Sequence, residues 1–319
     1  MTPRPPRPDG LVLSTGRLYC DLVFRGLEAM PQLGEERFAD DVAIVPGGGG
    51  FITAAHLAGL GRPAALLARL GEDPLAQSLL PTLESSGVEL AFLERAADAG
   101  PQLTVAMIRD SERAFLSRRA GPARPATLLA ALGDVRAAHL HIAEFATLAE
   151  IPHLVTDARH HGLTVSLDPS WDDALIRSPD LVARCSGVDI FLPNASEARA
   201  IAGCDDLDIA GQRLARHFAL VAVKDGADGA RLYQGDERIM LPAAPSRGVL
   251  DTTGAGDAFN AGFLAAWLAD RSPERALAEG IACGTLSVQS VGGAGHVLDP
   301  RQVARIADQL LEEPLRRHG

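Results

Sequence analysis

Short runs of aliphatic residues alternate along this chain with longer segments in which apolar residues recur at helical spacing. The runs that we expect to form strands are apolar on both faces and cover residues 11–14, 64–68, 138–142, 163–167, 188–192 and 220–223. The segments expected to form helices cover residues 152–161, 171–185, 194–202 and 272–290. Strands that are buried on both faces and joined through helices are typical of a parallel sheet covered by helices. The pattern therefore predicts an α/β fold with a mostly parallel central sheet.

Two segments interrupt this alternation, at about residues 21–45 and 88–117. In the second, residues 103–108 and 114–117 alternate between apolar and polar positions, which favours half-buried strands in hairpin-like pairs. Residues 1–10 contain four prolines and little that could pack, so we expect a disordered tail there. The rest of the chain, residues 11–319, is predicted to form one domain that carries the two strand-forming segments as insertions.

The composition is that of a globular protein. Of the 319 residues, 47% are hydrophobic and only 4% are aromatic, so the chain can bury a large aliphatic core. A formal net charge of −11 argues against a nucleic-acid or anionic-membrane surface, because no basic stripe is present. The longest apolar runs, such as residues 263–269, are too short to span a membrane, and the proline-rich start lacks the apolar core of a signal peptide. We therefore expect a cytoplasmic protein.

The most specific chemical signal is the segment Leu-Asp-Thr-Thr-Gly-Ala-Gly-Asp-Ala-Phe-Asn at residues 250–260, which leads into an apolar helix. Gly254, Ala255 and Gly256 have almost no side chain, so their backbone N–H groups can surround an anion at the positive end of the helix dipole. Asp257 falls in the first helical turn, beside that anion. A carboxylate there can accept a proton from a hydroxyl group while the N–H groups stabilise a transferring phosphoryl group. The sequence thus predicts phosphoryl transfer with Asp257 as the base.

A second glycine-rich stretch begins at Pro46 and continues as Gly-Gly-Gly-Gly-Phe-Ile-Thr-Ala-Ala. Leu-Ala-Gly-Leu-Gly follows at residues 57–61 and Leu-Gly-Glu-Asp at residues 70–73. The two motifs lie about 200 residues apart. In their order, spacing and residues they resemble the two signatures of the ribokinase-like, or PfkB, carbohydrate kinases, and weaker matches extend this resemblance over nearly the whole chain beyond the first ten residues.

The resemblance implies a ribokinase-like three-layer α/β/α fold with a mostly parallel central sheet and a small β-sheet lid, here formed by the segments at about 21–45 and 88–117. It implies ATP-dependent phosphorylation of a hydroxyl group on a sugar or sugar-like small molecule, with Mg²⁺ as cofactor. A nucleoside kinase of the same fold and a non-catalytic sugar-sensing homologue remain alternatives, although a pure sensor has no chemical need of Asp257 and the glycines. The resemblance also leaves open a homodimer formed through the lid.

Two polar sites at strand ends are candidates for the nucleotide. Asn194 and Glu197 follow the expected strand at 188–192 and, by themselves, predict a helix N-cap with a capping-box glutamate. In the resembled family an Asn-x-x-Glu motif organises the phosphates and a water-bound Mg²⁺, an ion that keeps most of its waters. Lys224 and Gly226 follow the expected strand at 220–223, at the side of the sheet where ligands gather in open α/β folds. The resemblance implies that they contact ATP, Lys224 as a point charge.

Asp21 is expected at the end of the first strand, where a carboxylate can accept hydrogen bonds from a polyol. The resemblance implies that it binds the acceptor together with the backbone of Gly47 and Gly48. One position departs from the family pattern, because the usual Asn of Gly-Gly-x-x-x-Asn-x-Ala falls on Ile52. An Ile52 side chain against the sugar would offer it no hydrogen-bond donor or acceptor group, which argues against ribose as a good substrate.

The resemblance further implies a monovalent cation site, with K⁺ as the candidate. Asp251, Thr253 and backbone carbonyls near residues 292–296 would supply the ligands. From the residues alone, Asp251 could equally cap the loop before the glycines. A bound K⁺ would hold the backbone N–H groups of that loop toward the phosphate.

Two other kinds of site are disfavoured. His139 and His141 alternate on an expected strand without carboxylate or cysteine partners at ligand spacing, so we do not expect a metal there. A dinucleotide-dependent oxidoreductase is disfavoured because residues 47–50 lack the Gly-x-Gly-x-x-Gly spacing after a first strand.

Overall fold

The computed structural model describes residues 9–109, 112–246, 248–269, 272–290, 292–295, 298–312 and 316–318. Residues 1–8 of the expected tail lie outside this described part, and so does His296 of the expected cation site. Within the described part, no helix is long and apolar enough to cross a membrane.

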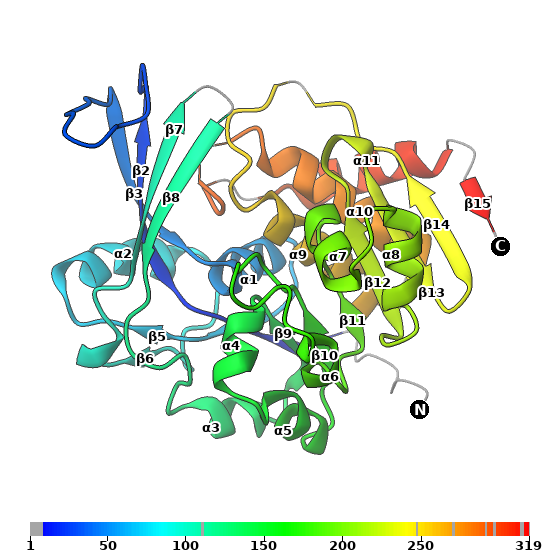
Figure 1. Cartoon of the computed structure of the whole chain (residues 1–319). Helices are drawn as coiled ribbons and strands as arrows, with labels where there is room; N and C mark the ends of the chain where they lie inside the picture. The colour runs from blue at the N-terminus through cyan, green and yellow to red at the C-terminus, as the bar shows by residue number, and fades with distance from the viewer. Residues whose placement is uncertain are drawn as a thin grey trace.

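A nine-stranded sheet runs through the centre of the molecule (Figure 1). From one edge to the other its strands are β4 (Ala64–Leu67), β1 (Leu11–Thr15), β9 (Ala137–Ile142), β10 (Thr164–Leu167), β11 (Ile190–Phe191), β12 (Leu220–Lys224), β13 (Ala230–Gln234), β14 (Glu237–Leu241) and β15 (Arg316–His318). The first six strands in this order run parallel, and the last three pair antiparallel. Each of the six aliphatic runs expected to form a strand overlaps one of the parallel strands, so the predicted α/β fold is confirmed.

Helices cover both faces of this sheet because its strands are apolar on both sides. On β1, Val12 belongs to one buried cluster and Leu11 and Leu13 to another. The helices of the first cluster are α1 (Gly49–Gly59), α2 (Pro74–Ser85), α9 (Ala255–Leu268), α10 (Pro273–Ser287) and α11 (Pro300–Glu312). Those of the second are α3 (Leu128–Leu132), α4 (Phe145–Glu150), α5 (Leu154–His160), α6 (Leu181–Arg184), α7 (Ala195–Ala202) and α8 (Leu207–Leu214). The alternation of faces along each strand thus produces the three layers.

A small, separate four-stranded sheet stands beside one end of the main sheet (Figure 1). Its strands, in spatial order, are β3 (Asp41–Gly47), β2 (Tyr19–Arg25), β7 (Leu103–Arg109) and β8 (Glu112–Arg118). They come from the two segments that interrupt the α/β pattern. Two shorter strands, β5 (Arg69–Leu70) and β6 (Glu94–Arg95), pair with each other, and 3₁₀ turns lie at Ala97–Ala99 and Gly226–Asp228.

Two local expectations are wrong. Residues 171–180 form turns rather than the first part of a long helix, and only α6 is helical there. The Asp172 side chain accepts a hydrogen bond from the Ala174 N–H (3.0 Å), and Pro179 restricts Ser178 to non-helical backbone. Asp21 does not end the first strand, because β1 stops at Thr15 and Asp21 is the third residue of β2 in the small sheet.

Candidate active site

A cavity of about 1360 Å³ opens where the carboxyl ends of the parallel strands meet the small sheet. Polar residues at the carboxyl ends of successive strands, or up to three positions beyond them, line it: Glu144 after β9, Asp168 after β10, Asn194 after β11 and Lys224 at the end of β12. Parallel strands bring their carboxyl ends to one edge, which is where ligands bind in open α/β sheets. The volume is large enough for two small-molecule substrates.

The residues expected to bind an anion form the start of α9. Gly254 has a φ of 75°, and a Cβ at this position would lie 2.5 Å from the Cα of Gly293, so only glycine fits here. Gly254, Ala255 and Gly256 all line the cavity. We call residues 254–256 the glycine turn. Its backbone N–H groups lie at the positive end of the α9 dipole and can therefore bind an anion.

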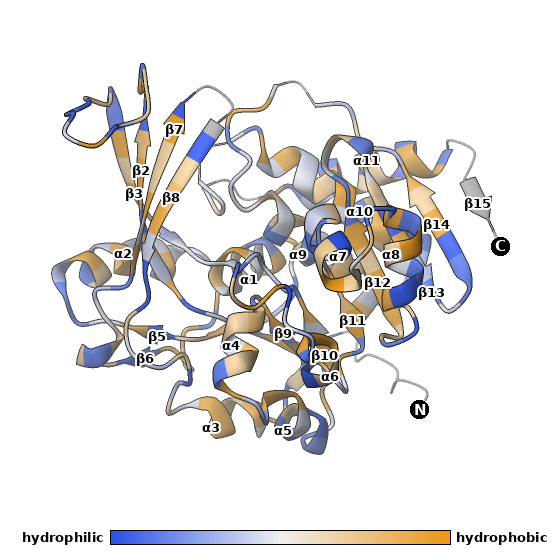
Figure 2. Cartoon of the chain, in the orientation of Figure 1, coloured by the Kyte–Doolittle hydropathy of each residue, from blue (hydrophilic) through white to orange (hydrophobic). Residues whose placement is uncertain are grey.

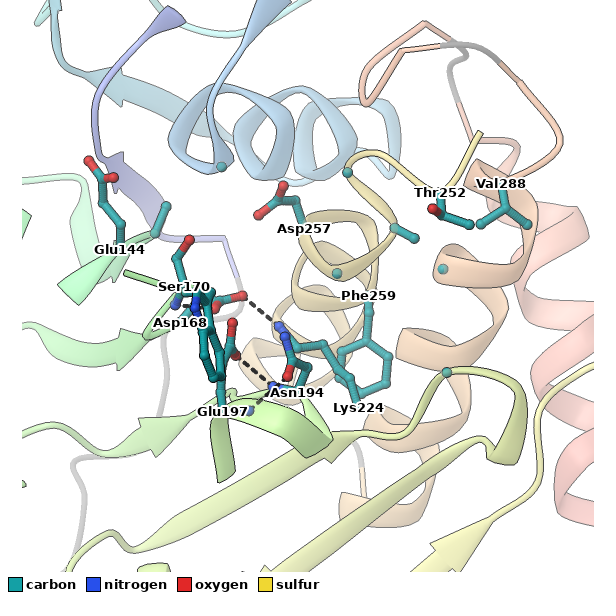
Figure 3. A pocket seen from close by; sticks show the side chains of 18 of the residues that line it. Glu144, Asp168, Ser170, Asn194, Glu197, Lys224, Thr252, Asp257, Phe259 and Val288 are labelled. Atoms are coloured by element: carbon teal, nitrogen blue, oxygen red, sulfur yellow. Dashed lines mark hydrogen bonds and ion pairs between the residues drawn. The ribbon is translucent and has the colours of Figure 1, made fainter. Parts of the chain in front are cut away.

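Asp257 lies in the first turn of α9 and points into the cavity (Figure 3). It also faces the start of α1, because a Cβ on Gly49 would lie 2.6 Å from its Oδ1. Burial raises the pKa of Asp257 to about 7, the negative charge of Asp168 acts in the same direction, and the positive charge of Lys224 opposes it. A carboxylate with a pKa near neutrality is well matched to accept a proton from a hydroxyl group.

A buried cluster lies beneath Asp257 (Figure 3). Lys224 Nζ is 2.5 Å from Asp168 Oδ2 and donates to Asn260 Oδ1 at 3.3 Å. Asn260 Nδ2 donates to the same Asp168 oxygen at 2.6 Å, and the other oxygen of Asp168 accepts from the Ser170 N–H at 3.0 Å. The cluster therefore connects the ends of β10 and β12 to the face of α9 that carries Asp257. Lys224 is close to the glycine turn, since a Cβ on Gly256 would lie 3.4 Å from its Nζ.

Asn194 and Glu197 form the predicted capping box at the start of α7. The Glu197 N–H donates to Asn194 Oδ1 (2.9 Å), and the Asn194 N–H donates to Glu197 Oε2 (2.8 Å). Both residues also line the cavity (Figure 3). Glu197 is buried, and burial followed by the charge of Asp168 raises its pKa to about 7. A bound cation is favourable beside a buried carboxylate such as Glu197, whose pKa is also raised by the charge of a neighbouring carboxylate.

At the other end of the cavity, Asp21 lies against Gly47, where a Cβ would be 1.9 Å from Asp21 Oδ2. Burial, and next the charge of Asp251, raise the pKa of Asp21 to about 7. Gly48 has a φ of 93° and lines the cavity, and a Cβ there would lie 2.1 Å from the Arg17 carbonyl oxygen. Asp21 and Gly47 are therefore neighbours on adjacent strands of the small sheet, and Gly48 follows Gly47 at the start of α1.

Ile52 is not where the acceptor hypothesis requires it. Its side chain is 3% exposed, belongs to the apolar core under α1, and is absent from the described residues that line the cavity. A Cβ on Gly293 would lie 2.5 Å from Ile52 Cδ1, so the side chain points toward the loop around Gly293. Gly48 and Gly49 reach the cavity at the start of α1, whereas Ile52, one helical turn further, packs against the loop beside it.

Asp251 is buried and holds the loop that precedes the glycine turn. Its Oδ1 accepts from the Thr253 N–H at 2.8 Å and its Oδ2 from the Gly292 N–H at 3.0 Å. His56 Nε2 lies 2.8 Å from the Gly293 carbonyl oxygen. These bonds agree with the loop-capping interpretation of Asp251, and they join the glycine turn to the segment at 292–293 that the cation hypothesis also invokes.

Sequence reasoning missed Asp168, Glu144 and Asn260. Glu144 lines the cavity and accepts from the Arg17 N–H (3.0 Å) and from Thr147 Oγ1 (2.8 Å). A usable signal existed, since Glu144 and Asp168 follow expected strands just as Lys224 does. Asn260 lies within the glycine motif itself, on the same face of α9 as Asp257.

Comparison with known proteins gives a consistent result. Residues 12–299 match the family described as "pfkB family carbohydrate kinase". The chain is 30% identical over 286 residues to an ATP-dependent ribose-1-phosphate kinase of Halopiger xanaduensis, and the aligned region covers 88% of this chain and 93% of that protein. It is 27% identical over 301 residues to a ribokinase of Bacillus subtilis, which covers 91% and 97%. The structure of Arabidopsis thaliana ribokinase complexed with ribose and ATP superposes with a TM-score of 0.81 at 25% identity, covering 95% of this chain and 99% of that one.

Proposed function

The chain belongs to the pfkB family of carbohydrate kinases, and we propose that it transfers the terminal phosphoryl group of ATP to a hydroxyl group of a sugar or sugar-like acceptor. The observation that carries this proposal is Asp257, a carboxylate with a pKa of about 7 in the cavity beside the glycine turn. Asp257 accepts the proton of the acceptor hydroxyl. The N–H groups of the glycine turn stabilise the negative charge on the transferring phosphoryl group.

The nucleotide end of the cavity is proposed to consist of Asn194, Glu197, Lys224 and Gly226, all of which line it. Glu197 and the nearby charge of Asp168 fit a divalent cation, because their mutual repulsion is relieved when a cation binds. Mg²⁺ would neutralise phosphate charge there and retain most of its waters. Lys224 shares its charge with Asp168, so it orients Asp168 and Asn260 in addition to attracting phosphate. The complex of Arabidopsis ribokinase with ATP supports ATP as the donor.

The acceptor end is proposed to consist of Asp21 and the backbone of Gly47 and Gly48, with the small sheet acting as a lid. Asp21, Thr104 and Ser117 pair with one another across three strands of that sheet and line the cavity. Carboxylate and hydroxyl groups are suited to bind sugar hydroxyls. The activities of the relatives on ribose 1-phosphate and ribose support a sugar acceptor.

A monovalent cation near Asp251 and Thr253 is part of this proposal. Asp251 already holds the glycine turn through the Gly292 N–H, and a bound K⁺ would add a second restraint on the same backbone. Activity should rise when K⁺ replaces a large organic cation at constant ionic strength. A flat response would remove the cation from the proposal.

A homodimer through the lid is also proposed, on the basis of the small sheet's outer face. One row of apolar residues crosses all four strands, on the face opposite the row that carries Asp21. It consists of Ile44, Leu22, Val105 and Leu116. Ile44 and Leu116 are 50% and 67% exposed, and apolar residues recur along this sheet (Figure 2). An exposed apolar sheet face favours self-association. The mass in solution should exceed the 33.5 kDa of one chain and fall to that value for Ile44→Lys.

A panel of acceptors tests the main proposal. ADP formation is measured with ribose, ribose 1-phosphate, sugar acids, deoxy sugars and nucleosides, each with ATP and Mg²⁺. At least one sugar-like acceptor should be turned over, and Asp257→Asn should reduce kcat for it by roughly 10² to 10⁴-fold with little change in ATP affinity. Near-normal turnover by the variant would show that Asp257 is not the base. Turnover of nucleosides alone would replace the sugar acceptor by a nucleoside.

A further inference from the structure

One arginine of the small sheet reaches across the cavity to the glycine turn. Arg113 lies on β8 and donates from Nη1 to Thr253 Oγ1, at 3.4 Å, and Thr253 immediately precedes Gly254. Arg113 is four residues from Ser117 on the same strand, so both side chains belong to the face that lines the cavity. In Figure 1, β8 is the strand of the small sheet nearest the chain segment that leads into α9. The contact joins two parts of the chain that are 140 positions apart.

Arg113 differs from the other cations of the cavity in its partners. In the described part of the chain, four arginine or lysine side chains line the cavity. Three of them pair with a carboxylate at N–O distances of 2.5 to 2.8 Å: Arg17 with Glu150, Arg119 with Asp172, and Lys224 with Asp168. Arg113 contacts only the Thr253 hydroxyl and the Phe115 ring, 5.6 Å away, within that same part of the structure. Its positive charge is therefore available to a ligand.

The glycine turn needs such a charge. Asp257, Asp168 and Glu197 line the cavity together with the glycine turn, and burial followed by the charges of Asp168 and Glu197 raises the pKa of Asp257. The single lysine of the sequence, Lys224, is paired with Asp168. Apart from the proposed Mg²⁺ and the part of the Lys224 charge that Asp168 leaves free, only backbone N–H groups then stabilise a multiply charged phosphoryl group against these carboxylates. A guanidinium group suits the role better than an ammonium group, because it offers parallel N–H donors to two oxygens of one phosphate.

Building on the proposed function, we propose that Arg113 is the catalytic cation that the small sheet supplies to the transferring phosphoryl group. The acceptor hydroxyl oxygen forms a bond to the terminal phosphorus of ATP, while the bond from that phosphorus to its bridging oxygen breaks. The electron pair of that bond leaves with ADP, and the hydroxyl proton passes to Asp257. Arg113 exchanges its weak bond to Thr253 for the phosphoryl oxygens and stabilises their charge without gaining or losing a proton. Because the same strand carries Ser117 at the acceptor end, transfer is linked to the position of the small sheet over the cavity.

The kinetic test compares Arg113→Ala and Arg113→Lys with Arg118→Ala. Arg118 is a matched control on the same strand, and its side chain donates to the Pro101 carbonyl on the opposite face. We expect Arg113→Ala to lower kcat by roughly 10² to 10³-fold, with the KM of the acceptor almost unchanged. Arg113→Lys should recover part of the loss, and added guanidinium ion should partly restore Arg113→Ala. Arg118→Ala should keep the wild-type kcat.

A binding measurement provides a readout that does not depend on turnover. Isothermal titration compares ADP alone with ADP plus aluminium fluoride, each with acceptor and Mg²⁺. Arg113→Ala should weaken the aluminium fluoride complex at least tenfold and leave the affinity for ADP alone near the wild-type value. An unchanged aluminium fluoride affinity, or a raised acceptor KM with a preserved kcat, would overturn the role of Arg113. Absence of ATP turnover by the wild type with every acceptor would instead contradict the proposed function.

Discussion

Asp168 and Lys224 should shift the pH dependence of the reaction in opposite directions. Burial raises the pKa of Asp257 to about 7, with Asp168 acting in the same direction and Lys224 against it. Replacing Asp168 with Asn removes a negative charge, so the pKa of Asp257 should fall. Replacing Lys224 with Met removes a positive charge, so the pKa should rise. A base must be ionised to act, so activity is lost on the acid side of the pH profile. The pH at which it falls to half should therefore move with the pKa of Asp257 in each variant.

Asp168→Asn is chosen to preserve most of the polar contacts of the buried cluster, whereas Lys224→Met removes two of them. The ion pair is shielded from water, with 11% of the Lys224 side chain and 8% of the Asp168 side chain exposed. Removing one partner of a buried pair outright costs roughly 3 to 5 kcal/mol of stability. Asn at position 168 keeps an oxygen that can accept from the Ser170 N–H and a polar group opposite Asn260. A neighbouring charge moves a pKa by about 1 to 3 units, and we expect about one unit here, equivalent to about 1.4 kcal/mol.

The assay is kcat/KM for the acceptor between about pH 5 and 9, at constant ionic strength. The wild-type activity should fall to half near pH 7, that of Asp168→Asn at a lower pH and that of Lys224→Met at a higher pH. Glu197 has a similar pKa and responds to the same two charges, so the apparent value belongs to the coupled groups. The control is Asp134→Asn, which lies before β9, at the end of that strand away from the cavity. This variant should leave the pH of half-maximal activity unchanged. If Asp168→Asn and Lys224→Met both move this pH in one direction, or neither moves it, the electrostatic explanation is wrong.

Three further substitutions test other parts of the site. Asp257→Asn should be more stable than the wild type by up to roughly 4 kcal/mol in urea denaturation at pH 8, and the gain should shrink between pH 7 and 4 as Asp257 becomes protonated. Gly254→Ala should lower the melting temperature and abolish turnover, because its Cβ would meet the Cα of Gly293 at 2.5 Å in a left-handed backbone. Ile52→Asn should destabilise the fold by roughly 1 to 3 kcal/mol by burying an unpaired amide, and kinetics should show no gain in ribose turnover.

The sequence could predict the layers of this fold because their cause is local. Runs such as residues 138–142 are apolar on both faces, and a strand buried on both faces belongs in a parallel sheet covered by helices. The capping box of Asn194 and Glu197 is local as well and was confirmed. The helix expected at 171–185 failed because its apolar spacing is interrupted by Pro179, and a turn held by Asp172 is more favourable.

The long-range parts of the site could not be predicted in the same way. Whether Ile52 faces the cavity depends on the rotation of α1 relative to the loop around Gly293, which no local pattern specifies. The bond between Asp168 and Asn260 joins residues 92 positions apart, and it exists only because β10 ends beside α9. The sequence can identify each polar residue at a strand end separately. Their pairing depends on the order of the strands in the sheet.

The same long-range arrangement makes the site costly for the fold. Asp21, Glu197 and Asp257 each have a pKa of about 7, and burial is the main cause in all three. A carboxylate whose folded-state pKa lies above its unfolded value contributes stability at about pH 4 and below, and loses it as the pH rises through 7. At neutral and alkaline pH the free protein therefore holds carboxylates whose ionisation opposes folding. A cation that binds beside such a carboxylate, such as Mg²⁺ in the proposed function, lowers the free-energy cost of its ionisation. The buried negative charges that destabilise the free protein therefore also favour binding of the cation.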